Sequence, residues 1–217
     1  MAGLQHARTA QNNSGQTSLE ILLGLMARHK EFDRDIALKA AITVFTEHGY
    51  EGTSTDALLS TMKISRQSMY DTFGDKRSLY LAALDRYNFD SVSQLVADLR
   101  RDTTPLKALE ETLIAFASRP ETEAGRGCLG VSAVCEFGRT DSAVSALTDK
   151  ASRLLSSAVQ AILEEGKKRG EVADDVNTAD AVQFLGSTLS GMKVSARNGA
   201  SPETLRGIAR LAIRSLR

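Results

Sequence analysis

The sequence predicts an all-α protein of about nine helices. Apolar residues recur at helical spacing along the chain, and no stretch sustains the two-residue alternation of a strand. The 217 residues include only three prolines and no tryptophan, and Ala, Leu, Arg and Glu are frequent, which favours helices. Apolar residues make up 42% of the chain, so it can bury a core.

Residues 1–30 are predicted to be a disordered leader, because residues 1–18 are polar and rich in Gln, Asn, Ser and Thr. The apolar run Leu19–Met26 is short and lacks the basic start and small-residue cleavage site of a signal peptide. The residues from Met26 onward read like an ordinary protein beginning, so we expect the natural start there. A native peptide covering residues 4–20 in mass spectrometry would refute that start.

The first helix of the folded region is predicted from Asp33 to His48. Gly49 follows it at the position where a left-handed residue closes a helix. The apolar positions recur three and four residues apart and predict one buried stripe. This stripe consists of Ile36, Ala40, Ala41, Val44 and Phe45.

Residues 54–80 encode two short helices joined by a tight turn. The first of the two is capped by Ser54 or Thr55 and turns Leu58, Leu59 and Met62 inward. Lys63 and Ile64 form the turn. Ser65 caps the second helix, which ends near Phe73 before Gly74. This is the layout of a helix-turn-helix DNA reader.

The second helix of this pair is too polar to be mainly structural. Met69 and Phe73 are four residues apart and can anchor it, while its other side chains face elsewhere. Those side chains are Arg66, Gln67, Ser68, Tyr70 and Asp71. Arginine can bind guanine, glutamine can bind adenine, and hydroxyls suit phosphates or base edges. Contact with the DNA backbone alone remains the alternative for Arg66 and Gln67.

The remaining helices follow from apolar periodicity and from their end signals. Pro105 and Pro202 suit first turns, and Gly170 and Gly199 follow helix ends. The predicted ranges are residues 76–100, 105–118, 128–137, 142–169, 178–197 and a last helix from Ser201.

The charge balance is neutral, with 27 Lys and Arg against 27 Asp and Glu. A DNA-binding protein is expected to carry a basic patch, so the total counts mildly against DNA binding. Four basic side chains nevertheless bracket the polar helix, and local placement sets the field at a phosphate. They are Lys63, Arg66, Lys76 and Arg77.

Residues 31–85 resemble the TetR family of one-component transcriptional regulators. The matching residues are Phe32-Asp33-Arg34, Ala40-Ala41, Phe45, Gly49-Tyr50-Glu51-Gly52-Thr53-Ser54, Ile64-Ser65, Met69-Tyr70, Phe73, Lys76 and Leu79. Lys63 departs from the glycine that the family often has in the turn, yet a non-glycine residue can adopt a left-handed conformation at modest cost. The resemblance implies a helix-turn-helix head at residues 31–78 and a ligand-binding and dimerisation body at residues 79–217.

The resemblance also implies roles for individual residues. Thr55, Tyr70 and Lys76 correspond to phosphate contacts, and Arg66, Gln67 and Ser68 to the base-facing group. Lys63 would add a phosphate contact, and Ser65 caps the polar helix that would contact the bases. Tyr70 as a half-buried core aromatic and Lys76 as a solvated charge remain the alternatives.

The body is predicted to dimerise through its last two helices, where small residues such as Gly186, Ser190 and Gly191 permit close approach; packing within one chain is the alternative. A small-molecule effector is expected in a pocket among the helices predicted from residues 76–100 to residues 178–197. Candidate lining residues, chosen for apolar character, are Tyr87, Phe89, Phe116, Cys128, Val131, Val134 and Phe184. They favour a small hydrophobic or electrophilic molecule.

Other motifs do not predict a catalytic, metal or cofactor site. Gly125, Gly127 and Gly130 spell G-x-G-x-x-G, but a helix precedes them where a dinucleotide fold has a strand. Cys128 and Cys135 lie seven residues apart, about 10.5 Å along one helical face, too far for a disulfide. We expect both to be buried small side chains, with an oxidant-sensing thiol as the alternative. Three scattered histidines form no triad.

These observations predict a ligand-responsive homodimeric repressor that binds a double-stranded DNA operator in the cytoplasm, with no cofactor and no membrane partner. The main alternative is a helical enzyme or small-molecule binding protein without a DNA role. A regulator that has lost its ligand is a third possibility. No run of about eighteen apolar residues predicts a transmembrane helix.

Overall fold

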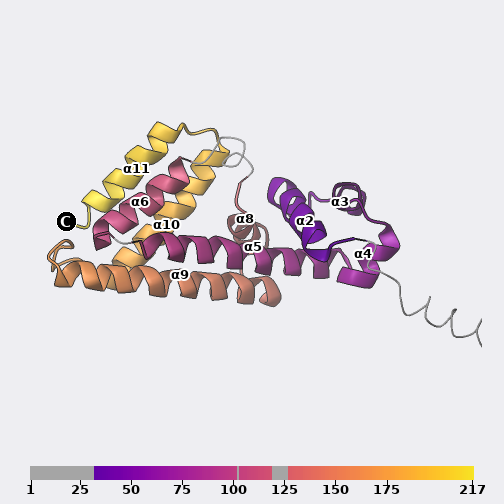
Figure 1. Ribbon diagram of the computed structural model, residues 1–217, viewed down its shortest axis with the longest axis horizontal. Helices are drawn as coiled ribbons and strands as arrows, with labels where there is room; N and C mark the ends of the chain where they lie inside the picture. Colours follow the sequence, from indigo (N-terminus) through magenta and orange to yellow (C-terminus); the bar gives the residue numbers. More distant parts are fainter. Residues whose placement is uncertain (1–31, 102, 119–126) are drawn as a thin grey trace, which may run out of the picture. The chain divides into compact units, whose positions relative to one another are not determined.

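The computed structural model describes residues 32–101, 103–118 and 127–217, so the leader predicted for residues 1–30 and its start at Met26 lie outside the described residues. Residues 34–217 form one compact unit. All nine elements of the described residues are α-helices (Figure 1). They are α2 (Arg34–His48), α3 (Thr55–Met62), α4 (Arg66–Phe73), α5 (Lys76–Leu99), α6 (Pro105–Ala117), α8 (Leu129–Phe137), α9 (Ser142–Lys168), α10 (Thr178–Arg197) and α11 (Pro202–Arg214).

Local capping groups explain where the short helices of the head begin and end. The side chain of Ser54 accepts a hydrogen bond from the N–H of Ala57 at the start of α3, at 3.1 Å. Ser65 does the same for Ser68 at the start of α4, at 3.0 Å. Each bond satisfies an N–H group that a helix start leaves without an intrahelical partner. These two side chains therefore set the register of the helix-turn-helix segment.

The helices α2 and α4 pack on α5, and α3 packs on α2. Leu58 and Met62 of α3 are buried and Leu59 is half-buried. The stripe predicted on α2 is wrong at Ile36, which is 67% exposed, whereas Leu38 is 4% exposed. Both residues are apolar and lie within one helical turn, so spacing alone could not decide which of them faces α5.

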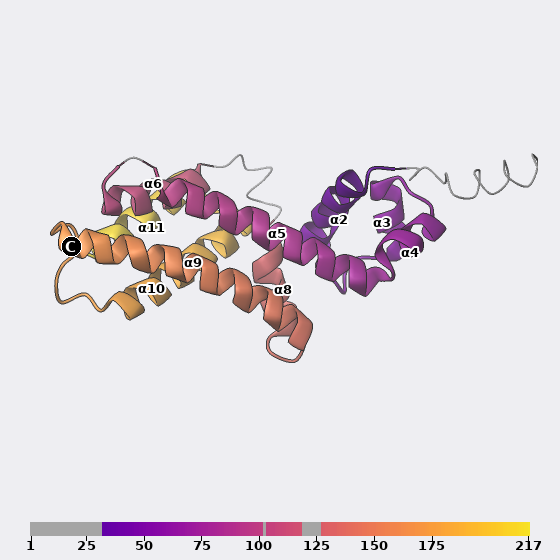
Figure 2. The ribbon, with the colours of Figure 1, turned by 60° about the horizontal axis from the view of Figure 1, so that its bottom comes forward.

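The rest of the unit is a helical body. The long helices α5 and α9 run alongside each other (Figures 1 and 2). Helix α6 packs on both of them, α10 packs on α9, and α11 packs on α6 and α10. The main core lies among these five helices and includes Leu99, Leu163 and Ala209. Since α5 also carries the head helices, it is shared by both parts, and the boundary predicted at residue 78 falls inside it.

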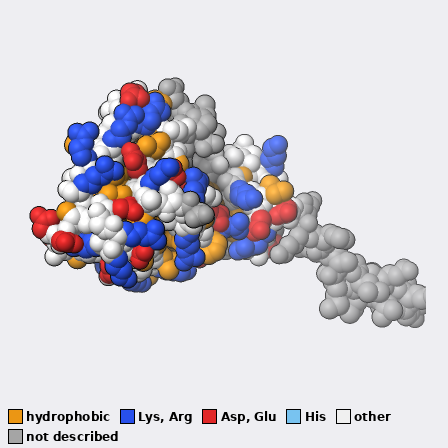
Figure 3. Space-filling view, turned by 60° about the vertical axis from the view of Figure 1, so that its left-hand side comes forward, with side chains coloured by type: hydrophobic (Ala, Val, Ile, Leu, Met, Phe, Trp, Pro, Cys, Tyr) orange, Lys and Arg blue, Asp and Glu red, His pale blue; other side chains and the backbone are white. Residues whose placement is uncertain are grey.

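The surface carries charges of both signs. Figure 3 shows one face on which Lys and Arg side chains are interspersed with Asp and Glu, in keeping with the neutral total. Within the described ranges, no helix combines the length and the apolar character needed to cross a lipid bilayer.

Candidate functional site

The turn between α3 and α4 is closed by Lys63 in a left-handed conformation. Its φ of 56° and ψ of 42° place it in the region that glycine normally occupies. It is the only non-glycine residue with positive φ in the part of the chain that the structure describes. The turn thus keeps the left-handed geometry while placing an exposed ammonium group directly before α4.

The helix α4 is held by one face and exposes the other. Met69 is 0% exposed and Phe73 is 8% exposed, so both anchor the helix against the head. Tyr70 is 47% exposed, and Gln67 is also exposed. Packing inside the monomer therefore does not occupy the polar face, and it is available to a nucleic acid.

Hydrogen bonds among the polar side chains organise this exposed face. The Arg66 guanidinium lies 2.6 Å from the Asp56 carboxylate of α3. Gln67 donates to the Asp71 carboxylate one turn later at 2.7 Å, and the hydroxyls of Ser65 and Ser68 lie 2.8 Å apart. Exposed ion pairs contribute little free energy, so Arg66 can exchange Asp56 for a base or phosphate at small cost.

Three further residues flank α4. Thr55 is the first residue of α3 and Lys76 the first residue of α5, and both are half-buried. The Lys76 ammonium lies 4.3 Å from the centroid of the Tyr50 ring, an attractive contact that leaves its N–H donors open to an anion. Arg77 is engaged by the Asp141 carboxylate at 2.6 Å and is therefore less available to DNA.

The body contains a cavity of about 540 Å³ between α5, α6, α8, α9 and α10. Four of the predicted lining residues contribute to its wall: Tyr87, Cys128, Val131 and Val134. The other three lie elsewhere. Phe89 is 62% exposed, Phe184 is 43% exposed on α10, and Phe116 is buried in the core. Apolar character marks a residue for burial but does not tell which side of its helix faces a cavity.

Cys128 is the N-cap residue of α8 and lies in the cavity wall together with Lys193 of α10. Burial raises the pKa of its thiol, but the Lys193 ammonium, a hydrogen bond with Tyr87 and the nearby N–H groups of α8 lower it. The net pKa of Cys128 lies below its ordinary value. A thiol with this environment is a better nucleophile than a buried thiol in purely apolar surroundings.

The two cysteines do not share one environment, which corrects the prediction that both are buried on one helical face. Cys128 precedes the helix and is buried, whereas Cys135 lies within α8 and is exposed. Both are free thiols. Among the described residues, no group of three or more His, Cys, Asp or Glu side chains could hold a metal ion.

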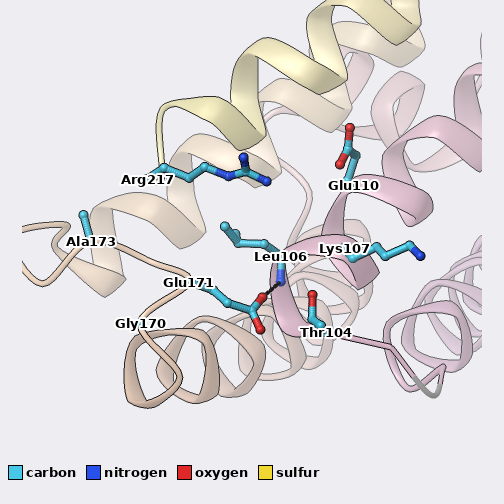
Figure 4. A pocket seen from close by; sticks show the side chains of 8 residues that line it. All are labelled: Thr104, Leu106, Lys107, Glu110, Gly170, Glu171, Ala173 and Arg217. Carbon is cyan, nitrogen blue, oxygen red and sulfur yellow. Dashed lines mark hydrogen bonds between the residues drawn. The ribbon is translucent and has the colours of Figure 1, made fainter.

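A second hollow, of about 660 Å³, lies at the start of α6 and has both polar and apolar side chains in its wall (Figure 4). Thr104 provides no side-chain cap for α6, and the Glu171 carboxylate accepts the N–H of Leu106 at 3.0 Å instead. Lys107, Glu110 and Arg217 line the same hollow. The Glu171 carboxylate in this hollow already accepts an N–H group at the start of α6, so we assign the hollow a structural role.

Sequence reasoning missed one residue at the junction of head and body. Glu136 of α8 accepts hydrogen bonds from the backbone N–H groups of Tyr50 and Glu51, which lie in the turn after α2. These partners are 86 and 85 residues away along the chain, so no local pattern reports the contact.

Comparison with known proteins agrees with this architecture. The family described as "Bacterial regulatory proteins, tetR family" matches residues 37–83, and the family "Tetracyclin repressor-like, C-terminal domain" matches residues 103–212. The second match alone spans half of the chain. The chain belongs to the TetR family. It is a DNA-binding transcriptional regulator with a helix-turn-helix head.

Relatives that match most of the chain support this assignment. The HTH-type transcriptional repressor ComR of Escherichia coli is 32% identical over 190 residues, covering 86% of this chain and 90% of ComR. The uncharacterized HTH-type transcriptional regulator YezE of Bacillus subtilis is 29% identical over 182 residues, covering 83% of this chain and 94% of YezE.

Solved TetR-family structures share the fold. A cysteine mutant of the TetR family transcriptional regulator CifR, complexed with 26bp double-strand operator DNA, superposes with a TM-score of 0.78 at 27% identity. The match covers 88% of this chain and 100% of that chain. A TetR-family regulator from Agrobacterium tumefaciens gives a TM-score of 0.75 at 20% identity, covering 84% and 96% of the two chains, and shows the fold alone.

Proposed function

We propose that the protein is a homodimeric repressor that binds a two-fold symmetric operator and releases it when a small molecule enters the body cavity. The observation that carries the proposal is the exposed polar face of α4, held in place by the buried side chains of Met69 and Phe73. The proposal is also supported by similarity to ComR, which is named a transcriptional repressor, and to CifR, whose structure contains operator DNA. A repressor of chromosomal genes would act in the cytoplasm.

In this proposal α4 enters the major groove. Arg66, Gln67 and Ser68 in its first turn face the base edges, since Arg pairs with guanine and Gln with adenine. The surrounding residues bind the DNA phosphates. The groups proposed to contact the phosphates are the hydroxyls of Thr55, Ser65 and Tyr70 and the ammonium groups of Lys63 and Lys76. The N-terminus of α4 adds its own partial positive charge.

The proposed dimer interface is the outer face of α10 and α11. Phe184 is 43% exposed, Val194 54% and Leu211 65%, which leaves apolar side chains of adjacent helices uncovered within one chain. A Cβ added at Gly191 or Gly207 would meet nothing within 4 Å, so these positions leave room for a partner helix. A dimer that places two heads about one helical turn apart suits a palindromic operator.

Leu211→Glu tests the interface. We expect this variant to be a monomer in analytical ultracentrifugation, because it would bury an unpaired carboxylate between the subunits. Leu154→Glu is the matched control, since Leu154 is 53% exposed and lies on α9, which is neither of the two helices of the proposed face. If Leu211→Glu sediments like the wild type, this interface is wrong.

The effector is proposed to occupy the cavity of about 540 Å³, a size that suits a drug-sized molecule. Its wall combines aliphatic side chains with hydroxyl and amide groups, and it also contains Lys193 and the thiol of Cys128. An effector changes operator affinity only if it binds the dimer more tightly at one spacing of the two heads than at another. The matched families are regulators, which supports this proposal over the helical enzyme that the sequence left open.

DNA binding is tested by mobility shift on fragments from upstream of the protein's own gene, titrated with salt. We expect specific binding whose affinity falls steeply with salt, because phosphate contacts release counterions. Replacing Tyr70 with Phe and Lys76 with Ala should weaken binding to all sequences alike and reduce the salt slope by about one for the lysine. Unchanged affinity in both variants would refute the phosphate contacts.

A further inference from the structure

The helix α8 touches two functional parts of the molecule within nine residues. Toward its start, Cys128, Val131 and Val134 line the cavity. At its end, Glu136 and Phe137 contact the turn after α2. The helix also lies against α5 and α9 (Figures 1 and 2). The helix α8 therefore connects the cavity wall to the turn at the end of α2.

The contact with the head is made by a carboxylate. The two oxygens of Glu136 accept the N–H of Tyr50 at 2.9 Å and the N–H of Glu51 at 3.2 Å. These N–H groups are consecutive and follow Gly49, whose φ is 71°. Successive N–H groups beside a left-handed residue form a concavity that binds anions. Here the anion comes from the body of the same chain.

The carboxylate approaches Gly49 so closely that a side chain at this position would displace it. A Cβ added to Gly49 would lie 2.6 Å from Oε1 of Glu136, well inside van der Waals contact. The neighbouring rings complete the contact: Phe137 lies 5.6 Å from Tyr50 and 5.7 Å from Tyr80, centroid to centroid. The turn and the end of α8 are thus fitted to each other by backbone, carboxylate and aromatic groups.

A cation holds the adjacent end of α2. Arg197, the last residue of α10, donates to the carbonyl oxygen of Glu47 at 3.0 Å and to the hydroxyl of Ser132 on α8 at 3.4 Å. The last carbonyls of a helix have no intrahelical partner, so a guanidinium satisfies one of them. Glu136 and Arg197 therefore bind neighbouring backbone groups at the end of α2. Glu136 accepts from two N–H groups, and Arg197 donates to a carbonyl oxygen.

We propose that Glu136 is a positioning residue for operator binding, which fixes the turn between α2 and α3 and thereby the direction in which the body presents α4. This inference rests on the proposed function. The turn precedes α3 by a few residues and is braced by the Thr53 hydroxyl, which donates to the carbonyl of Gly49 at 2.6 Å. Without Glu136 the turn keeps its ring contact with Phe137 but loses its hydrogen bonds to α8, and the two heads of a dimer no longer hold one spacing.

The test compares two variants that remove the same charge, Glu136→Gln and Glu136→Ala. A glutamine retains one acceptor oxygen for the two N–H groups, whereas alanine retains none. Loss of a negative charge near the head would by itself strengthen DNA binding, and it would do so equally in both variants. Their difference therefore isolates the hydrogen bonds. Glu164→Gln is the control, because Glu164 is exposed and accepts a hydrogen bond from Gln160 of its own helix.

Two measurements follow on the full chain. In hydrogen–deuterium exchange, we expect the amides of Tyr50 and Glu51 to exchange at least about tenfold faster in Glu136→Ala than in the wild type. In Glu136→Gln their exchange rates should lie between those of the wild type and of Glu136→Ala. In fluorescence anisotropy on an operator fragment, we expect Glu136→Ala to bind about tenfold more weakly than Glu136→Gln, while Glu164→Gln binds like the wild type. A merely structural residue would show itself in a lower Tm and in exchange throughout the head.

Unchanged exchange at Tyr50 and Glu51 in Glu136→Ala would overturn the inference, and so would equal operator affinity in the two variants. The exchange measurement needs no DNA. If the wild type binds no DNA but exchange rises as expected, the proposed function fails while the contact itself stands.

Discussion

Gly49 offers the sharpest test of how the head is joined to the body. Gly49→Ala places a Cβ on a residue with a φ of 71°, at 2.6 Å from Oε1 and 2.9 Å from Cδ of Glu136. Two costs therefore act together, namely backbone strain and displacement of the carboxylate. Gly170 separates them, because its φ is 68° and a Cβ there would meet nothing within 4 Å.

The strain is common to both positions and amounts to about 1–2 kcal/mol for a left-handed alanine. The second cost arises only at Gly49. Hydrogen bonds to a charged group contribute about 1.5–3 kcal/mol when buried, but these N–H groups are accessible to water, so about 1–2 kcal/mol for the pair is the expected loss. For a chain of this size, each kcal/mol lowers Tm by about 2–4 °C.

The assay is thermal unfolding at one fixed protein concentration, since dimerisation makes Tm depend on concentration. We expect Gly49→Ala to be less stable than Gly170→Ala by about 1–2 kcal/mol, and the excess to vanish when both are made in the Glu136→Ala background. Equal destabilisation at the two glycines, or an excess that survives removal of Glu136, would refute the reasoning.

Three further predictions concern the anchor, the charges and the thiols. Met69→Ala should destabilise the head by about 2–5 kcal/mol and abolish operator binding without changing the sedimentation of the body, because Met69 is fully buried; circular dichroism and ultracentrifugation check this. The pKa of Asp141 is lowered by hydrogen bonds from backbone N–H groups, that of Val144 first, and by Arg77. The stabilisation by the Asp141 carboxylate is therefore present above the ordinary pKa range of Asp and is lost as pH falls through the folded pKa. Asp141→Asn should lower Tm at neutral pH and make Tm decrease less steeply below about pH 4 than in the wild type. Parallel profiles of Tm against pH would contradict this. Cys135 should be alkylated by N-ethylmaleimide before Cys128, since it is exposed and Cys128 is 7% exposed; peptide mass spectrometry shows the order, and faster labelling of Cys128 would mean that the low pKa outweighs burial.

The sequence predicted the helices well because their ends are set locally. Ser65 caps α4 through an N–H three residues ahead, and Gly49 closes α2 in a left-handed conformation. Such signals need no knowledge of the rest of the fold. The left-handed conformation of Lys63 was expected only from the family resemblance, because the family often has glycine at this position.

Long-range geometry could not be predicted in the same way. Glu136 is an ordinary charged residue in the sequence, and its role depends on a turn that lies 86 residues away. Phe89, Phe116 and Phe184 are apolar, but only the assembled helices decide that one is buried in the core and two face outward. Residue type reports burial on average, and the packing of partners decides which face is buried.

The central claim is that the exposed face of α4 reads base sequence. Selection of bound duplexes from a random DNA library, with the wild type and with Gln67→Ala and Arg66→Ala, tests it most directly. The account predicts that the wild type selects a two-fold symmetric motif and that each variant loses preference at one symmetric pair of positions while keeping the rest. Identical motifs from all three proteins would show that α4 touches only the DNA backbone and would contradict the account.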